Sequence, residues 1–139
     1  MLLAVLRSSL AGCVALLALS GCSLGRDEEP KPVRGAPRQV VASVVRLQRA
    51  VNRRDWRTVC DGLFTPAARR RAGGAECARR LRSDAQDLRR PHIELVSIRV
   101  SGERAEVRVR SRAAGQPPLS DVIELRRSGR GYRIESLAD

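Results

Sequence analysis

Aromatic residues are scarce in this chain of 139 residues and make up only 2% of it. A core without many large rings must be built from valine, leucine, isoleucine and alanine. Hydrophobic residues in total reach 42%, which is ordinary for a globular protein and argues against wholesale disorder. The length allows a single domain with a small core.

Lysine is almost absent. Lys31 is the single lysine among 27 basic residues, which stand against 15 acidic ones and give a net charge of +12. Such an excess favours polyanionic partners, for example anionic lipid or an acidic cell-wall polymer. Selection for charge alone would use lysine and arginine freely, so the skew also fits the codon usage of a GC-rich genome. Aromatic residues do not interleave with the arginine runs, which argues against binding of single-stranded nucleic acid. Secretion, for which the start of the chain gives a signal, makes nucleic acid the least expected polyanion, so we expect no nucleic-acid partner.

Groups that carry chemistry are few as well. The only histidine is His92, and with four cysteines it leaves too few soft ligands for a metal site. The chain has no glycine-rich phosphate loop and no convincing serine–histidine–aspartate arrangement. We therefore expect no metal, no cofactor and no enzymatic activity.

The chain begins with the segment MLLAVLRSSLAGCVALLALSGC, in which Arg7 is the only charge. Its uncharged part has the length of a signal-peptide core and is too short to span a bilayer comfortably. It ends in Leu19-Ser20-Gly21-Cys22, which resembles the lipobox of bacterial lipoproteins. The resemblance implies that residues 1–21 are a signal peptide, that Cys22 is lipidated, and that the protein is held on the extracytoplasmic face of the cell membrane.

A second match to the lipobox, Leu10-Ala11-Gly12-Cys13, follows a shorter apolar run that Arg7 interrupts. Cys22 is therefore preferred, although a misassigned start codon would reverse the preference in favour of Cys13. Removal of the signal peptide leaves 26 basic and 15 acidic residues, a net charge of +11. Residues 22–37 are rich in proline and mixed charge and are predicted to be a flexible tether, which precedes a folded domain at 38–139.

Helices are predicted in the first half of this domain, over residues 38–54, 56–63, 66–72 and 75–90. The first of them is amphipathic, because apolar residues recur at helical spacing from Val40 to Val51. Asp55 and Thr65 are expected to cap the second and third helices. Gly73-Gly74 separates the third from the fourth, which should turn Leu88 toward the core and stop before Pro91.

From His92 onward the hydrophobic period is two, which predicts four antiparallel strands with one apolar face. Turns are expected at Ser101-Gly102, at 115–118 and at 129–131. In the first strand, Ile93 and Leu95 share one face, whereas Val96, Ile98 and Val100 share the other. A bulge or a strong bend near Leu95-Val96 would let both sets meet the same core. The predicted fold is α+β, with helices packed on a curved, cone-shaped sheet.

This order of elements, with the ending Gly-Tyr-Arg-Ile-Glu-Ser-Leu at 131–137, resembles the nuclear-transport-factor-2-like (cystatin-like) superfamily. More closely it resembles small secreted lipoproteins of that fold from GC-rich Gram-positive (actinobacterial) bacteria. Those carry an Asp-Trp…Cys helix, as at Asp55-Trp56…Cys60, and a second helical cysteine, as at Cys77. Their last strand usually has tryptophan where this chain has Tyr132. The enzymes of the superfamily include ketosteroid-isomerase-like and polyketide-cyclase-like (SnoaL-like) proteins.

Two cysteines, Cys60 and Cys77, remain after lipidation of Cys22. In an exported domain such a pair predicts a disulfide, which here would join the second helix to the fourth. Their spacing is not that of a redox-active Cys-x-x-Cys pair.

Three residues are candidates for lining a pocket in the cone: Trp56, Asp121 and Tyr132. Asp121 shares strand parity with Ile123 and could point inward near the mouth, whereas Trp56 and Tyr132 are equally explained by packing. The isomerase-like enzymes use an acid as base together with a polarising group, and no acid–base pair at convincing spacing emerges here. We expect a binding or interaction module for an unknown protein or small molecule. The alternative is an isomerase or cyclase acting on a small apolar molecule in the cone.

Overall fold

The computed structural model describes residues 34–137. Its elements are α1 (Ala36–Asn52), η1 (Thr58–Leu63), α2 (Pro66–Arg71), η2 (Gly74–Glu76), α3 (Cys77–Asp84), β1 (His92–Ser101), β2 (Arg104–Arg112), β3 (Leu119–Ser128) and β4 (Gly131–Leu137). The predicted signal peptide, Cys13 and Cys22 lie outside the described residues. The chain's folded part belongs to a compact unit, Pro32–Asp139. Because this unit contains the whole hydrophobic core, we expect it to fold on its own.

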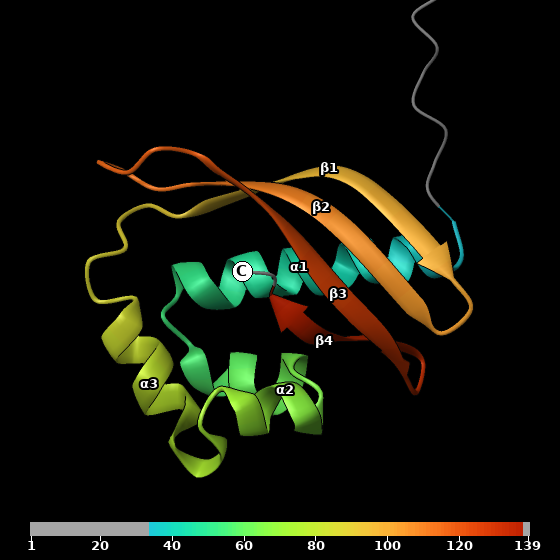
Figure 1. Ribbon diagram of the computed structural model, residues 1–139, viewed down its shortest axis with the longest axis horizontal. Helices are drawn as coiled ribbons and strands as arrows, with labels where there is room; N and C mark the ends of the chain where they lie inside the picture. Colours follow the sequence, from blue (N-terminus) through green and yellow to red (C-terminus); the bar gives the residue numbers. More distant parts are fainter. Residues whose placement is uncertain (1–33, 138–139) are drawn as a thin grey trace, which may run out of the picture. The chain divides into compact units, whose positions relative to one another are not determined.

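The four strands form one antiparallel sheet in the order β1-β2-β3-β4, as the alternating pattern predicts. The strands curve around α1, which lies against one face of the sheet (Figure 1). Inward-facing residues of the strands are buried, and the alternate residues are exposed. The predicted α+β class, with helices preceding a curved sheet, is confirmed.

The first helix occupies the hollow of the sheet because one of its sides is apolar. Its buried residues are Val40, Ser43, Val44, Leu47 and Ala50. Two polar side chains tie it to the two edge strands. The Ser43 hydroxyl donates to the Tyr132 carbonyl at 2.7 Å, and the Gln48 amide donates to the Pro91 carbonyl at 2.9 Å. The Gln48 side-chain oxygen also accepts from the backbone N–H of Ile93.

Each edge strand carries a β-bulge. In β1, Leu95 pairs with Val109 and Ser97 with Arg108, so that Val96 is the extra residue and the predicted bulge is confirmed. In β4, a second register shift leaves Glu135 without a partner. Bulges bend a strand and increase its twist, so the sheet is bent along both edges.

The prediction that Val96 meets the core is wrong. As the inserted residue it turns outward and is 58% exposed. Ile98 and Val100, beyond the bulge, pack against the core on the same side as Ile93 and Leu95. The bulge thus places the apolar residues on both sides of it against the same core, and the inserted Val96 is left exposed to solvent.

The fourth predicted helix is shorter than expected. It was predicted over 75–90, but α3 ends at Asp84, and Arg90 adopts a positive φ of 47°. A residue before proline is disfavoured in helical geometry, and the chain must reverse here to enter β1. Leu88 consequently lies half-buried outside the core, and its carbonyl accepts a hydrogen bond from Arg54 at 3.1 Å.

Both predicted caps are present. The Asp55 carboxylate accepts from the Thr58 backbone N–H at 3.0 Å and from the Thr58 hydroxyl at 2.6 Å, at the start of the turn that continues as the π-helix η1. The Thr65 hydroxyl accepts from the backbone N–H of Ala68 at 3.1 Å and begins α2. The Thr65 N–H itself donates to the Ile134 carbonyl at 2.9 Å, so this segment covers part of the outer edge of β4.

Cys60 and Cys77 form a disulfide, as predicted. Both are buried, and the bond joins η1 to α3. Between them the chain turns at Gly73, whose φ of 111° is one that residues with a side chain rarely adopt.

We predict that replacing both cysteines with serine lowers the free energy of unfolding. The bond closes a loop with a sequence separation of 17 residues, for which the chain-entropy model gives about 3 kcal/mol. Urea denaturation of the chain 23–139 would measure the difference. The wild-type protein under reducing conditions should match the variant, and equal midpoints for oxidised and reduced protein would contradict the prediction.

The cap at Asp55 should make stability depend on acidity. Hydrogen bonds from the hydroxyl and backbone of Thr58 hold the pKa of this carboxyl below its ordinary value of 3.8. Its stabilising effect is therefore complete above that value and is lost as the pH falls through the lower pKa of the folded state. When the pH is lowered from about 5 to about 2, the melting temperature of Asp55→Asn should therefore decrease less than that of the wild-type protein. Asp84→Asn, at an exposed carboxyl, is the control and should behave as wild type.

Candidate functional site

An apolar groove opens where the second half of α1 faces the sheet. Its walls are Leu47, Val51, Leu88, Ile93, Val109 and Ile123, which come from α1, the segment before β1, and strands β1 to β3. Its volume is about 320 Å³, which is at the lower end for pockets that hold small molecules. We refer to it as the apolar groove.

Apolar side chains also surround its mouth. Leu119 and Leu137 line the groove and are 59% and 47% exposed. Single exposed leucines are common on protein surfaces, whereas two that adjoin an apolar opening enlarge the apolar surface a ligand can cover. Neither leucine was singled out from the sequence, although Leu119 shares the strand parity of Asp121.

Asp121 lies in the apolar groove, as its strand parity predicts. Its carboxylate accepts a hydrogen bond from the Ser111 hydroxyl at 3.0 Å. His92 also lines the groove, at the start of β1. Arg112 and Gln116 line it as well, and all of these groups could orient a polar end of a ligand.

Gln48 fixes the wall of the groove beside His92. Its side-chain amide forms hydrogen bonds with the backbone on both sides of that residue. The NH₂ group donates to the Pro91 carbonyl, and the oxygen accepts from the Ile93 N–H. The start of β1 is thereby held against α1. Nothing in the local sequence pattern distinguishes Gln48 from an ordinary polar residue of a helix surface, so its role emerges only from the fold.

Trp56 lies beside the groove and not in it. It lines an adjoining hollow that shares Val51, Leu88, Pro91 and His92 with the groove. The indole is 6% exposed, and its buried N–H has no hydrogen-bond partner in the described part of the chain. Trp56 thus packs in the core next to the apolar groove.

Tyr132 lies in a different place. It is 3% exposed, and the Arg127 guanidinium lies 5.7 Å from the centroid of its ring. It lines a hollow formed by the first half of α1 and the β3–β4 turn. The three candidate residues therefore do not form one pocket, and only Asp121 belongs to the apolar groove.

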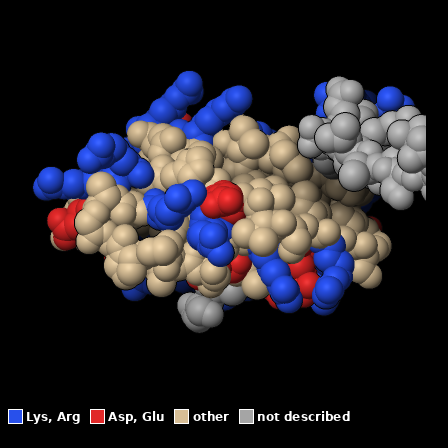
Figure 2. All heavy atoms as spheres, turned by 90° about the horizontal axis from the view of Figure 1, so that it is seen from above, with Lys and Arg blue, Asp and Glu red and all other residues tan. Residues whose placement is uncertain are grey.

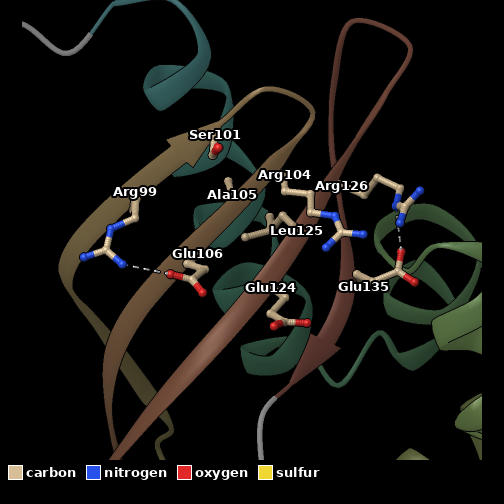
Figure 3. Close-up of a pocket in the computed structure, with 9 residues that line it drawn as sticks. All are labelled: Arg99, Ser101, Arg104, Ala105, Glu106, Glu124, Leu125, Arg126 and Glu135. Carbon is tan, nitrogen blue, oxygen red and sulfur yellow. Dashed lines mark hydrogen bonds and ion pairs between the residues drawn. The ribbon is translucent and has the colours of Figure 1, made fainter.

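The outer face of the sheet is highly charged. In Figure 2, basic and acidic side chains lie side by side on the face seen from above. A hollow on the outer face of the sheet is lined by Arg99, Arg104, Arg126, Glu106, Glu124 and Glu135, together with Ser101, Ala105 and Leu125 (Figure 3). Arg99 lies 3.5 Å from Glu106, and Arg126 lies 3.6 Å from Glu135. Such exposed pairs contribute little stability, but they leave this face with much of its charge locally balanced.

Within residues 34–137, no helix is long and apolar enough to cross a membrane. The same residues contain no group of three or more histidine, cysteine, aspartate or glutamate side chains placed to hold a metal ion.

Comparisons with known proteins bear on the fold alone. No protein-family model and no curated protein sequence matches the chain. A solved structure described as the de novo designed NTF2 fold protein NT-9 is similar, with 17% sequence identity, 76% of this chain and 88% of that chain covered, and a TM-score of 0.48.

Proposed function

We propose that the protein is a membrane-anchored, extracytoplasmic lipoprotein with a nuclear-transport-factor-2-like domain, and that this domain binds a small apolar molecule without transforming it. The observation that carries the binding role is the apolar groove with its rim of exposed leucines. Covering this surface removes apolar area from water, which favours binding by about 25 cal/mol for each Å² buried.

The polar groups of the groove favour orientation over catalysis. The Asp121 carboxylate already accepts a hydrogen bond from the Ser111 hydroxyl. An isomerase-type mechanism needs, besides such a base, a group that polarises the substrate. Tyr132 lines another hollow, Arg112 lies 3.0 Å from Glu94, and within residues 34–137 His92 makes no hydrogen bond with Asp121. Asp121 is the observation that supports the alternative of an isomerase or cyclase, and Asp121→Asn should abolish any turnover found.

The anchoring role rests on the resemblance of Leu19-Ser20-Gly21-Cys22 to a lipobox. Lipid on this cysteine would leave the domain tethered to the membrane surface, where anionic lipid and cell-wall polymer are the polyanions within reach. An extracytoplasmic location also fits the Cys60–Cys77 disulfide, since disulfides persist in oxidising compartments.

The groove is tested with a neutral apolar dye, N-phenyl-1-naphthylamine, whose fluorescence increases in apolar surroundings. We expect saturable binding to the chain 23–139. Leu88→Trp, which fills the groove from its half-buried wall, should weaken binding by about tenfold or more, equivalent to about 1.4 kcal/mol. Val96→Trp adds the same ring on the opposite, exposed face of the sheet and should leave binding unchanged. Equal affinity of the two variants would refute binding in the groove.

Anchoring is tested by changing the two candidate cysteines separately in the full chain expressed in a lipoprotein-processing bacterium. Cys22→Ala should move the protein from the detergent-extracted membrane fraction to the soluble fraction and remove the mass of the lipid. Cys13→Ala should leave both unchanged. The reverse result would assign the lipid to Cys13, and retention of residues 1–21 in the native protein would overturn the proposal.

A further inference from the structure

A second hollow, at the other end of α1, is basic. Arg46 of α1, Arg130 of the β3–β4 turn and Arg133 of β4 line it together with Ser43 and Tyr132. Its volume is about 310 Å³, and no acidic residue lines it. We refer to it as the arginine hollow.

The three arginines have no acidic partner in residues 34–137. The acids nearest to them in sequence are engaged elsewhere. Asp55, which lines another hollow with Arg46, accepts two hydrogen bonds from Thr58, and Glu135 lies 3.6 Å from Arg126. This differs from the outer face of the sheet, where arginines and glutamates interleave (Figure 3). Like charges that line one hollow without a counter-charge repel one another, and an anion placed among them relieves that repulsion.

Two buried polar groups at the arginine hollow also lack partners. The hydroxyl oxygen of Tyr132 and the side-chain oxygen of Gln39 are buried, and neither makes a hydrogen bond in the described part of the chain. Both residues line the hollow. A buried polar group without a partner is costly. The tyrosine hydroxyl is a donor, and the Gln39 amide can rotate to present its NH₂ group. Both atoms are shielded from solvent, so they reach an anion in the hollow only if neighbouring side chains move.

We propose that the arginine hollow is a binding site for a phosphate group. The planar fork of a guanidinium matches two oxygens of a phosphate, and such charge-assisted pairs are among the stronger hydrogen bonds in proteins. Three arginines, one from α1 and two from the β3–β4 hairpin, suit a group with several charged oxygens better than a single carboxylate. The phosphate can belong to a soluble compound or to a lipid headgroup, which present the same chemistry. The site is separate from the apolar groove and does not depend on the groove's ligand or on the lipid anchor.

The test compares two triple variants of the chain 23–139 that lose the same charge. In the first, Arg46, Arg130 and Arg133 become glutamine. In the second, the control, the outer-face residues Arg104, Arg108 and Arg110 become glutamine, none of which lies in an ion pair with another described residue. Inorganic phosphate is titrated at constant ionic strength and followed by NMR. The first variant should bind at least about tenfold more weakly than wild type, and the control within about threefold of it, because only the first removes charge-assisted hydrogen bonds.

Vesicles distinguish the two sources of phosphate. Binding to phosphatidylglycerol vesicles, absent with phosphatidylcholine and lost only in the first variant, would assign the site to a lipid headgroup. Binding of inorganic phosphate without vesicle binding would assign it to a soluble phosphate. If the first variant fails to fold by circular dichroism, Arg130→Gln, on the exposed turn, replaces it. Equal effects in the hollow and control variants, or no binding of phosphate or vesicles by wild type, would overturn the proposal.

Discussion

The bend of the sheet is the constraint on which the rest of this domain depends. A flat sheet would meet α1 along one line of contact, whereas a sheet bent by bulges at Val96 and Glu135 closes around it. Only then can one helix reach both edge strands, through Ser43 on one side and Gln48 on the other. With few aromatic rings to fill space, the core depends on this close wrapping of small aliphatic side chains.

The same geometry sets where the openings lie. A straight helix inside a curved sheet does not fill the hollow evenly, and its two ends meet different surroundings. The second half of α1 contributes Leu47 and Val51 to the apolar groove, and the first half contributes Ser43 to the arginine hollow. One helix therefore lines two hollows of opposite character, and a change in the middle of α1 would affect both through packing.

Local patterns in the sequence were enough to predict the α+β class, the capped helices, the bulge in β1 and the disulfide. Each of these depends on neighbours in sequence or on a short list of possible partners, as with Asp55 capping a helix or Cys60 having one other thiol available. The end of α3 was mispredicted because helical propensity favours continuation past Asp84, whereas the reversal into β1 is imposed by packing. Val96 was mispredicted because the pattern locates a bulge without saying which residue is inserted.

The site was less predictable than the fold for a related reason. Asp121 lies in the groove because strand parity decides which face a residue occupies. Whether Trp56 and Tyr132 line the same pocket as Asp121 depends instead on how the helices and turns pack together in space. The alternation of side chains along a strand does not predict this packing. The arginine hollow unites Arg46 with Arg130 and Arg133, which are separated by most of the domain in sequence. In a chain so rich in arginine, no pattern marks these three as different from the others.

The use of arginine in place of lysine has a consequence for how the hollow responds to its surroundings. A guanidinium group keeps its proton at every pH at which proteins remain folded, whereas a lysine amine placed among other cations gives up its proton more readily. Arg46, Arg130 and Arg133 all carry guanidinium groups, and no lysine lines the hollow. A phosphate monoester, by contrast, gains its second proton near pH 6. If a phosphate monoester binds in the hollow, its affinity should therefore change with pH near the pKa at which the phosphate itself takes up a proton.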